Sequence, residues 1–227
     1  MDTLKNLFFK YKHGFLVLAY FAIYLPWFAW LEDEVIWNYK IISMDIDKHI
    51  PFCEVFIVPY LLWFFYVAAV IIYFIFADKT DYYKLCTFLF TGMTLFLIIS
   101  TLWPNGHHLR PLAMPRDNIF TDMVQGLYHT DTATNLWPSI HVYNSLGTHI
   151  AIAHSKKLEK KKGIQIASMI LSSSIVMSTV FLKQHSMFDV ITAFVLAAIM
   201  YIIVYRCDIP RALHTSLYKR KQKLQTN

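Results

Sequence analysis

Charged residues are scarce in this chain of 227 residues: only 16% are Asp, Glu, Lys or Arg, whereas 56% are hydrophobic. This scarcity argues against an ordinary soluble domain and is typical of proteins that cross a membrane several times. The mean hydropathy of +0.41 points the same way. The length suits one membrane domain over residues 1–227, an integral membrane protein with short loops.

Cysteines are also few, and Cys53, Cys86 and Cys207 lie far apart without any CxxC spacing. The sequence therefore predicts neither a disulfide framework nor a zinc site. It contains no internal repeat and no low-complexity tract. No small-residue cleavage site follows the first apolar run, so we expect no cleavable signal peptide.

Acidic residues are fewer than basic ones, and the net charge is +6. A basic chain can bind nucleic acid, but here the basic residues lie between apolar runs, and we expect no nucleic-acid partner. With both termini on one side of the membrane, that side holds 16 of the 21 Lys and Arg residues. The positive-inside rule then places both termini in the cytoplasm of a multi-pass cell-membrane protein.

Six apolar runs predict an all-α bundle of six transmembrane helices. The runs are Gly14–Leu31, Val55–Ala77, Leu85–Trp103, Ser139–His154, Ile164–Leu182 and Phe188–Tyr205. Polar side chains such as Asn144 and His149 interrupt the fourth run, so we expect that helix inside the bundle, away from lipid. Outside the runs, Met1–His13 suits a membrane-surface segment, and 206–227 forms a basic cytoplasmic tail.

The turn between the last two runs carries the first candidate for chemistry. His185 and Asp189 are four residues apart and would share one face of a helix. A carboxylate bonded to one ring nitrogen fixes the tautomer and leaves the other nitrogen free as a nucleophile or base. The alternative is a pair that merely caps a helix at the membrane interface.

Two further polar clusters fall on the same predicted outer face, so the chemistry is expected within residues 104–189. Ser139 can cap a helix, which places His141 at a helix N-terminus whose free N–H groups attract anions. Arg110, from the long 104–138 segment, offers a planar fork suited to phosphate oxygens.

Two histidines, an arginine and a helix N-terminus form a set for phosphoryl transfer that requires no metal and no cofactor. One histidine attacks phosphorus while the other protonates the leaving oxygen. His107 and His108 are the alternative metal ligands. No third ligand has a clear spacing, so we interpret them as loop histidines.

The same clusters resemble a known family. Arg110-Pro111, Pro138-Ser139-Ile140-His141 and Ser178…His185…Asp189 are similar to the three motifs of the type 2 phosphatidic acid phosphatase superfamily. The resemblance implies a six-helix fold in which His185 forms a phosphohistidine, Asp189 orients it and His141 is the general acid. It also implies that Arg110 and the backbone at Ser139 and Ile140 bind phosphate.

The departures from the family pattern concern mainly cations. Trp103 and Thr179 stand where the family usually has lysine and arginine, so Lys183, Arg116 or His108 are expected to substitute. Ile140 replaces a glycine, which resembles the branch of inositol phosphorylceramide synthases and their bacterial relatives. The members of that branch transfer a phosphoryl head group between lipids.

The expected function is that of a membrane lipid phosphatase, which hydrolyses a lipid phosphate ester at the outer leaflet. One alternative is a phospholipid head-group phosphotransferase. An alternative of another class is a non-catalytic transporter or scaffold on the same fold, with polar residues of the fourth helix along a path. A transporter needs polar positions along several helices, whereas these gather at one end. The sequence leaves the lipid and the oligomeric state open.

Overall fold

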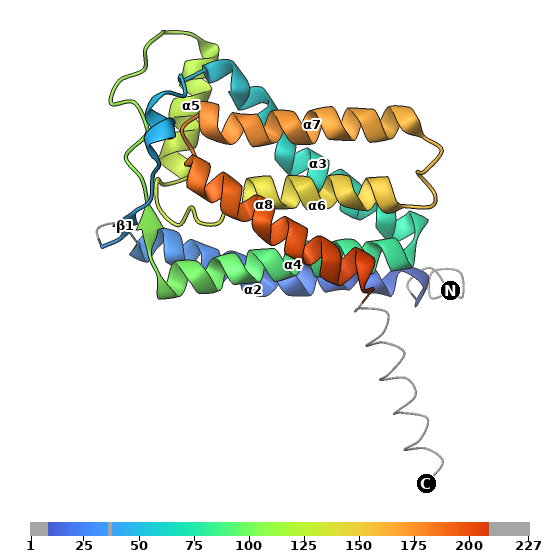
Figure 1. Ribbon diagram of the computed structural model, residues 1–227. Helices are drawn as coiled ribbons and strands as arrows, with labels where there is room; N and C mark the ends of the chain where they lie inside the picture. The colour runs from blue at the N-terminus through green and yellow to red at the C-terminus, as the bar shows by residue number, and fades with distance from the viewer. Residues whose placement is uncertain (1–8, 36–37, 209–227) are drawn as a thin grey trace.

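The computed structural model describes residues 9–35 and 38–208. Most of the expected surface segment Met1–His13, and nearly all of the basic tail, lie outside these residues. Six helices run back and forth between the two ends of one bundle (Figure 1). They are α2 (Phe15–Glu34), α3 (Ile57–Ala77), α4 (Lys79–Leu102), α6 (Ile140–His154), α7 (Lys162–Phe181) and α8 (Met187–Tyr201), which a π-helical turn (Ile202–Arg206) continues.

Most of the remaining structure lies in the connections at one end of the bundle (Figure 1). Helix α5 (Ile119–Thr130) begins at Asn118, whose side chain accepts hydrogen bonds from the first-turn N–H groups of Phe120 and Thr121. The parallel strands β1 (Lys40–Ile41) and β2 (Asn105–Gly106) join the loop between α2 and α3 to the loop between α4 and α5. Three 3-10 turns complete the fold: Lys12–Gly14, Asp45–Lys48 and Glu54–Phe56.

The all-α class is confirmed, and five helices are long and apolar enough to cross a membrane. These are Phe9–Glu34, Glu54–Ala77, Lys79–Leu102, Lys162–Phe181 and Met187–Arg206. The predicted number of six needs correction. Helix α6 has 15 residues and rises about 22 Å, which is less than the roughly 30 Å of a bilayer's hydrocarbon core.

Helix α6 lies in the interior of the bundle, as its polar sequence predicts, and packs against α3, α4, α7 and α8. Two glycines allow this close packing. A Cβ added at Gly92 of α4 would lie 2.0 Å from the Tyr143 ring, and one at Gly147 would lie 2.4 Å from Phe88. The Tyr143 hydroxyl also donates a 2.7 Å hydrogen bond to the Phe88 carbonyl. The other helices therefore supply the contacts that lipid would otherwise make.

Candidate active site

The two histidines predicted to act together meet at one end of the bundle. His185 lies in the turn between α7 and α8, and His141 lies in the first turn of α6. The His185 Nε2 and the His141 Nδ1 are 3.5 Å apart. Both side chains are buried, with exposed fractions of 4% and 8%. At this separation a phosphorus atom cannot fit between the two nitrogens, so a substrate must part the rings or approach from the side.

Asp189 has two roles in this structure. Its Oδ2 accepts a 2.9 Å hydrogen bond from the Ser186 N–H, and the Ser186 hydroxyl accepts one from the Asp189 N–H, so this pair caps α8. The same Oδ2 lies 3.5 Å from the His185 Nδ1. That contact is too long or too poorly aligned for a hydrogen bond, and within the described chain the Nδ1 has no other partner. Capping and ring contact are thus compatible.

The surroundings of His185 keep its ring neutral. Burial, and then the positive charge of Arg110, lower the pKa of His185 to about 3. A neutral imidazole has one unprotonated nitrogen, which is the form that a nucleophile requires. His185 is therefore ready to attack at neutral pH without first losing a proton to solvent.

The start of α6 provides an anion site beside the histidines. The Ser139 Oγ accepts a 3.4 Å hydrogen bond from the Val142 N–H, and the Ser139 N–H donates to the Asp189 carbonyl at 3.4 Å. These bonds fix the N-terminus of α6 against α8. The N–H groups of Ile140 and His141 belong to the first turn, where a helix offers no internal acceptor. They are available to phosphate oxygens.

Arg110 lies close to this centre, but protein groups occupy most of its guanidinium. One terminal nitrogen donates to the Tyr128 carbonyl at 3.2 Å, and the other donates to the Asp131 carbonyl at 2.7 Å and to the Gln184 side chain. The guanidinium carbon lies 4.3 Å from the centre of the Tyr128 ring. Its Nε is buried and has no hydrogen-bond partner in the described chain. That N–H is one donor left for a substrate.

Two of the three side chains expected to replace the missing cations bind elsewhere. Arg116 forms a fork-like ion pair with Glu54, with N–O distances of 2.7 and 2.5 Å. Lys183 donates from Nζ to the carbonyls of Asp47 and Ile50 at 2.8 and 2.5 Å. In this structure both cations hold the loop between α2 and α3 in place.

The sequence did not reveal a network centred on Asp131. Its Oδ2 accepts hydrogen bonds from the Tyr60 hydroxyl at 3.0 Å and from the Gln184 amide at 3.2 Å. The Tyr60 ring lies 4.5 Å from the His141 ring, and Gln184 directly precedes His185. Asp131 therefore connects the surroundings of both histidines. Burial and the charge of Glu32 raise its pKa to about 6.

We expect Asp131→Asn to stabilise the protein above pH 6. The folded protein holds this proton more tightly than the unfolded chain, so the contribution of Asp131 to stability is fully present below about pH 4 and is lost as the pH rises through 6. A shift of about two units, discounted for partial exposure, corresponds to on the order of 2 kcal/mol. Thermal unfolding of both proteins at pH 4 and pH 8 checks this. An equal difference at both pH values would contradict it.

His107 is a structural residue in this arrangement. Its Nε2 lies 3.1 Å from the Gln184 carbonyl, and its Nδ1 accepts from the Leu109 N–H at 3.3 Å, so both ring nitrogens are in use. Burial lowers its pKa to about 4. Within residues 9–35 and 38–208, no three His, Cys, Asp or Glu side chains are grouped so as to hold a metal ion.

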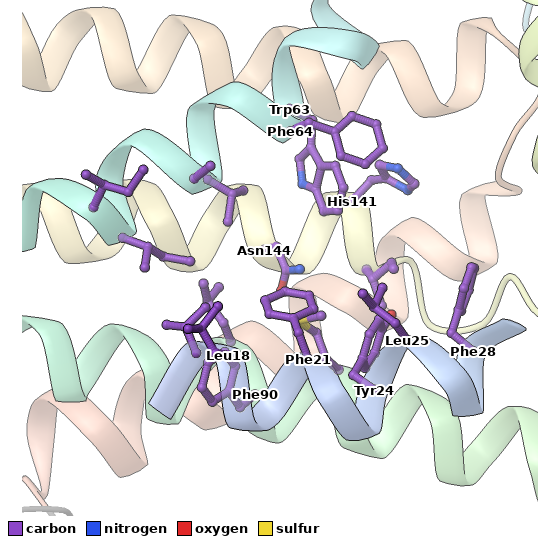
Figure 2. Close-up of a pocket in the computed structure, with 18 of the residues that line it drawn as sticks. Leu18, Phe21, Tyr24, Leu25, Phe28, Trp63, Phe64, Phe90, His141 and Asn144 are labelled. Atoms are coloured by element: carbon purple, nitrogen blue, oxygen red, sulfur yellow. The ribbon is translucent and has the colours of Figure 1, made fainter. Parts of the chain in front are cut away.

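A large apolar cavity reaches the same centre from the side. It has a volume of about 960 Å³, lies between α2, α3, α4 and α6, and includes His141 and Asp131 in its lining (Figure 2). His141 therefore has His185 beside it and the cavity in contact with it.

No protein-family model, curated protein or solved structure matches the chain.

Proposed function

We propose that this protein is an integral membrane enzyme that removes a phosphoryl group from a lipid phosphate through a phosphohistidine at His185. The observation that carries the proposal is the meeting of His185 with His141, from segments 44 residues apart, in a buried site bordered by an apolar cavity. The resemblance of the three motifs to the type 2 phosphatidic acid phosphatase superfamily supports it.

The first step assigns one role to each side chain. The unprotonated Nε2 of His185 attacks phosphorus, the bond from phosphorus to the lipid oxygen breaks, and His141 gives that oxygen a proton. Asp189 stabilises the charge that develops on the His185 ring. The Arg110 Nε–H and the first-turn N–H groups of α6 bind the phosphoryl oxygens.

The second step regenerates the enzyme. His141 takes a proton from water, the water oxygen bonds to phosphorus, and the bond from phosphorus to His185 breaks. Inorganic phosphate leaves, His185 returns to its neutral form, and His141 returns to the protonated form that acts as the acid. The histidines and the fixed N–H donors thus supply the nucleophile, the acid and the positive field.

The proposal is tested with purified protein and dioleoyl phosphatidate. We expect phosphate release that persists in EDTA, together with an acid-labile, base-stable phosphoenzyme in the quenched protein. Loss of activity in EDTA, with recovery on adding one divalent ion, would contradict this mechanism. Absence of release from a panel of lipid phosphates would favour the transporter or scaffold alternative.

A second candidate is head-group phosphotransfer, in which a lipid alcohol takes the place of water. The apolar cavity that reaches His141 favours it, because a lipid hydroxyl could lie beside the general base. The two candidates differ only in the acceptor. Mass spectrometry of the products, with and without an added lipid alcohol, distinguishes them.

The proposal includes the orientation of the bundle. We place the active-site end at the outer face of the cell membrane and both termini in the cytoplasm, with α6 connecting the two ends of the bundle inside the five longer helices. In a background with the three cysteines replaced by alanine, cysteines at Asn118 and Lys40 should react with an impermeant reagent on intact cells. A cysteine at Lys160 should react only after the membrane is opened. The reverse pattern would place the site in the cytoplasm.

A further inference from the structure

The cavity beside His141 has features that hydrolysis of a lipid phosphate at His185 does not use. Of the described residues that line it, none is Lys or Arg, and its ionisable lining groups are His141, Asp131 and tyrosines. His185, Arg110 and Asp189 are not part of the lining. A phosphate head group would therefore meet a carboxyl group here and no compensating cation. The electrostatics favour an uncharged occupant.

Three buried polar atoms belong to residues that line this cavity and lack partners in the described chain. They are the Tyr24 hydroxyl, the Trp63 Nε1 and the Asn144 Oδ1. The three residues have exposed fractions of 5%, 8% and 1%. Figure 2 shows their side chains around the same space, on α2, α3 and α6. Buried polar groups without partners are costly, so three of them around one cavity indicate a ligand that completes their hydrogen bonds.

The three atoms also define the chemistry of that ligand. The Trp63 N–H can only donate, the Asn144 carbonyl oxygen can only accept, and the Tyr24 hydroxyl can do either. A hydroxyl group satisfies both kinds of atom, because it donates one hydrogen bond and accepts others. A carbonyl group can take only the donors. The polar part of the cavity therefore matches an alcohol.

The route into the cavity runs through the apolar part of the bundle. Helices α2 and α3 both pack against α4 but make no extensive contact with each other. Exposed side chains of both helices belong to the lining: Leu18 and Leu25 of α2, and Phe64 and Ile72 of α3, all more than half exposed. An occupant can therefore enter sideways from lipid, with its chain remaining in apolar surroundings.

We infer that the cavity is a binding site for an uncharged long-chain lipid alcohol, whose hydroxyl group contacts Trp63, Asn144 and Tyr24 while its chain extends between α2 and α3. The volume of about 960 Å³ lies at the upper end of the range for small-molecule sites. This site is distinct from the phosphate centre and does not depend on the proposed reaction. His141 contacts both the cavity and His185.

The test uses 1-monooleoylglycerol that carries a diazirine and an alkyne in its chain, with protein bearing His185→Ala so that no turnover occurs. We expect saturable photolabelling of α2, α3 or α6. Unlabelled monooleoylglycerol should compete at concentrations at least ten-fold lower than oleoyl lysophosphatidate, which has the same chain and a charged head. Equal competition by the two lipids would overturn the inference of an uncharged ligand.

Variants locate the site. Trp63→Phe and Asn144→Leu each remove one hydrogen-bonding group and should weaken binding by up to about ten-fold. Ala68→Phe places a ring in the cavity and should abolish saturable labelling. Ala69→Phe is the matched control, because Ala69 is also exposed on α3 but does not line the cavity. Equal labelling of Ala68→Phe and Ala69→Phe would overturn the proposed location of the site. If Ala68→Phe does not elute as a single species in size-exclusion chromatography, the other two variants decide. Unchanged affinity in both Trp63→Phe and Asn144→Leu would then overturn the proposed site.

Discussion

Replacing His185 with alanine should reduce phosphoryl transfer to the background of the uncatalysed reaction, for lipid and aryl phosphates alike. The side chain supplies the attacking nitrogen, and no other described nitrogen lies in the same position between Asp189 and His141. Without a nucleophile no phosphoenzyme forms, so the quality of the leaving group has no effect. Turnover and trapping of the phosphoenzyme measure this directly.

His149→Ala provides a control for the loss of a histidine from the bundle. His149 also lies on α6, but its ring contacts Ser168 at 3.0 Å on the α7 side. We expect this variant to retain activity and to form phosphoenzyme. Phosphoenzyme trapped in His185→Ala would show that another residue is the nucleophile.

Replacing His141 with alanine should have a large effect that depends on the substrate. A general acid typically contributes about two to four powers of ten in rate, and its loss is felt most when the leaving oxygen needs a proton. We expect this loss with dioleoyl phosphatidate. With p-nitrophenyl phosphate, whose leaving group departs without a proton, much of the rate of phosphoenzyme formation should return, whereas hydrolysis of the phosphoenzyme still lacks its base.

The comparison of the two variants tests the assignment of roles. His141→Ala should still form phosphoenzyme from the aryl substrate, whereas His185→Ala should not. The opposite result, with aryl phosphate rescuing only His185→Ala, would mean that the nucleophile and the acid are interchanged. Asp189→Asn should show no rescue, because it affects the orientation of the attacking ring.

Local patterns were sufficient to predict much of this fold. Apolar runs located five of the spanning helices, because each helix must cover a fixed thickness of hydrocarbon with its own side chains. The fourth run showed its interior position through Asn144 and His149. The predicted run Ser139–His154 agrees with α6 to within one residue, so the error lay in counting so short a run as a full span.

The candidate site was only partly accessible from sequence. Two features of the site are local: the spacing of His185 and Asp189, and the helix cap at Ser139. A short sequence motif can therefore predict them. Arg116 pairs with Glu54, and Lys183 donates to backbone carbonyls of the loop between α2 and α3. These partners lie far away in sequence. A hydrogen bond to a backbone carbonyl cannot be predicted from residue type, because every residue has a carbonyl group. The cavity depends on where four helices fail to pack, which no single segment determines.

The hydrogen bonds between the loop that joins α2 to α3 and the turn that bears His185 affect the order in which the protein folds during synthesis. Lys183 binds carbonyls at Asp47 and Ile50, and the Asp47 carboxylate accepts a 2.7 Å hydrogen bond from the Met187 N–H, 140 residues further along the chain. A ribosome adds about 5–20 residues per second, so this loop must wait on the order of ten seconds for its partner. The candidate active site is therefore among the last parts of the molecule to form, and a chain that ends before Lys183 leaves the loop between α2 and α3 without these bonds.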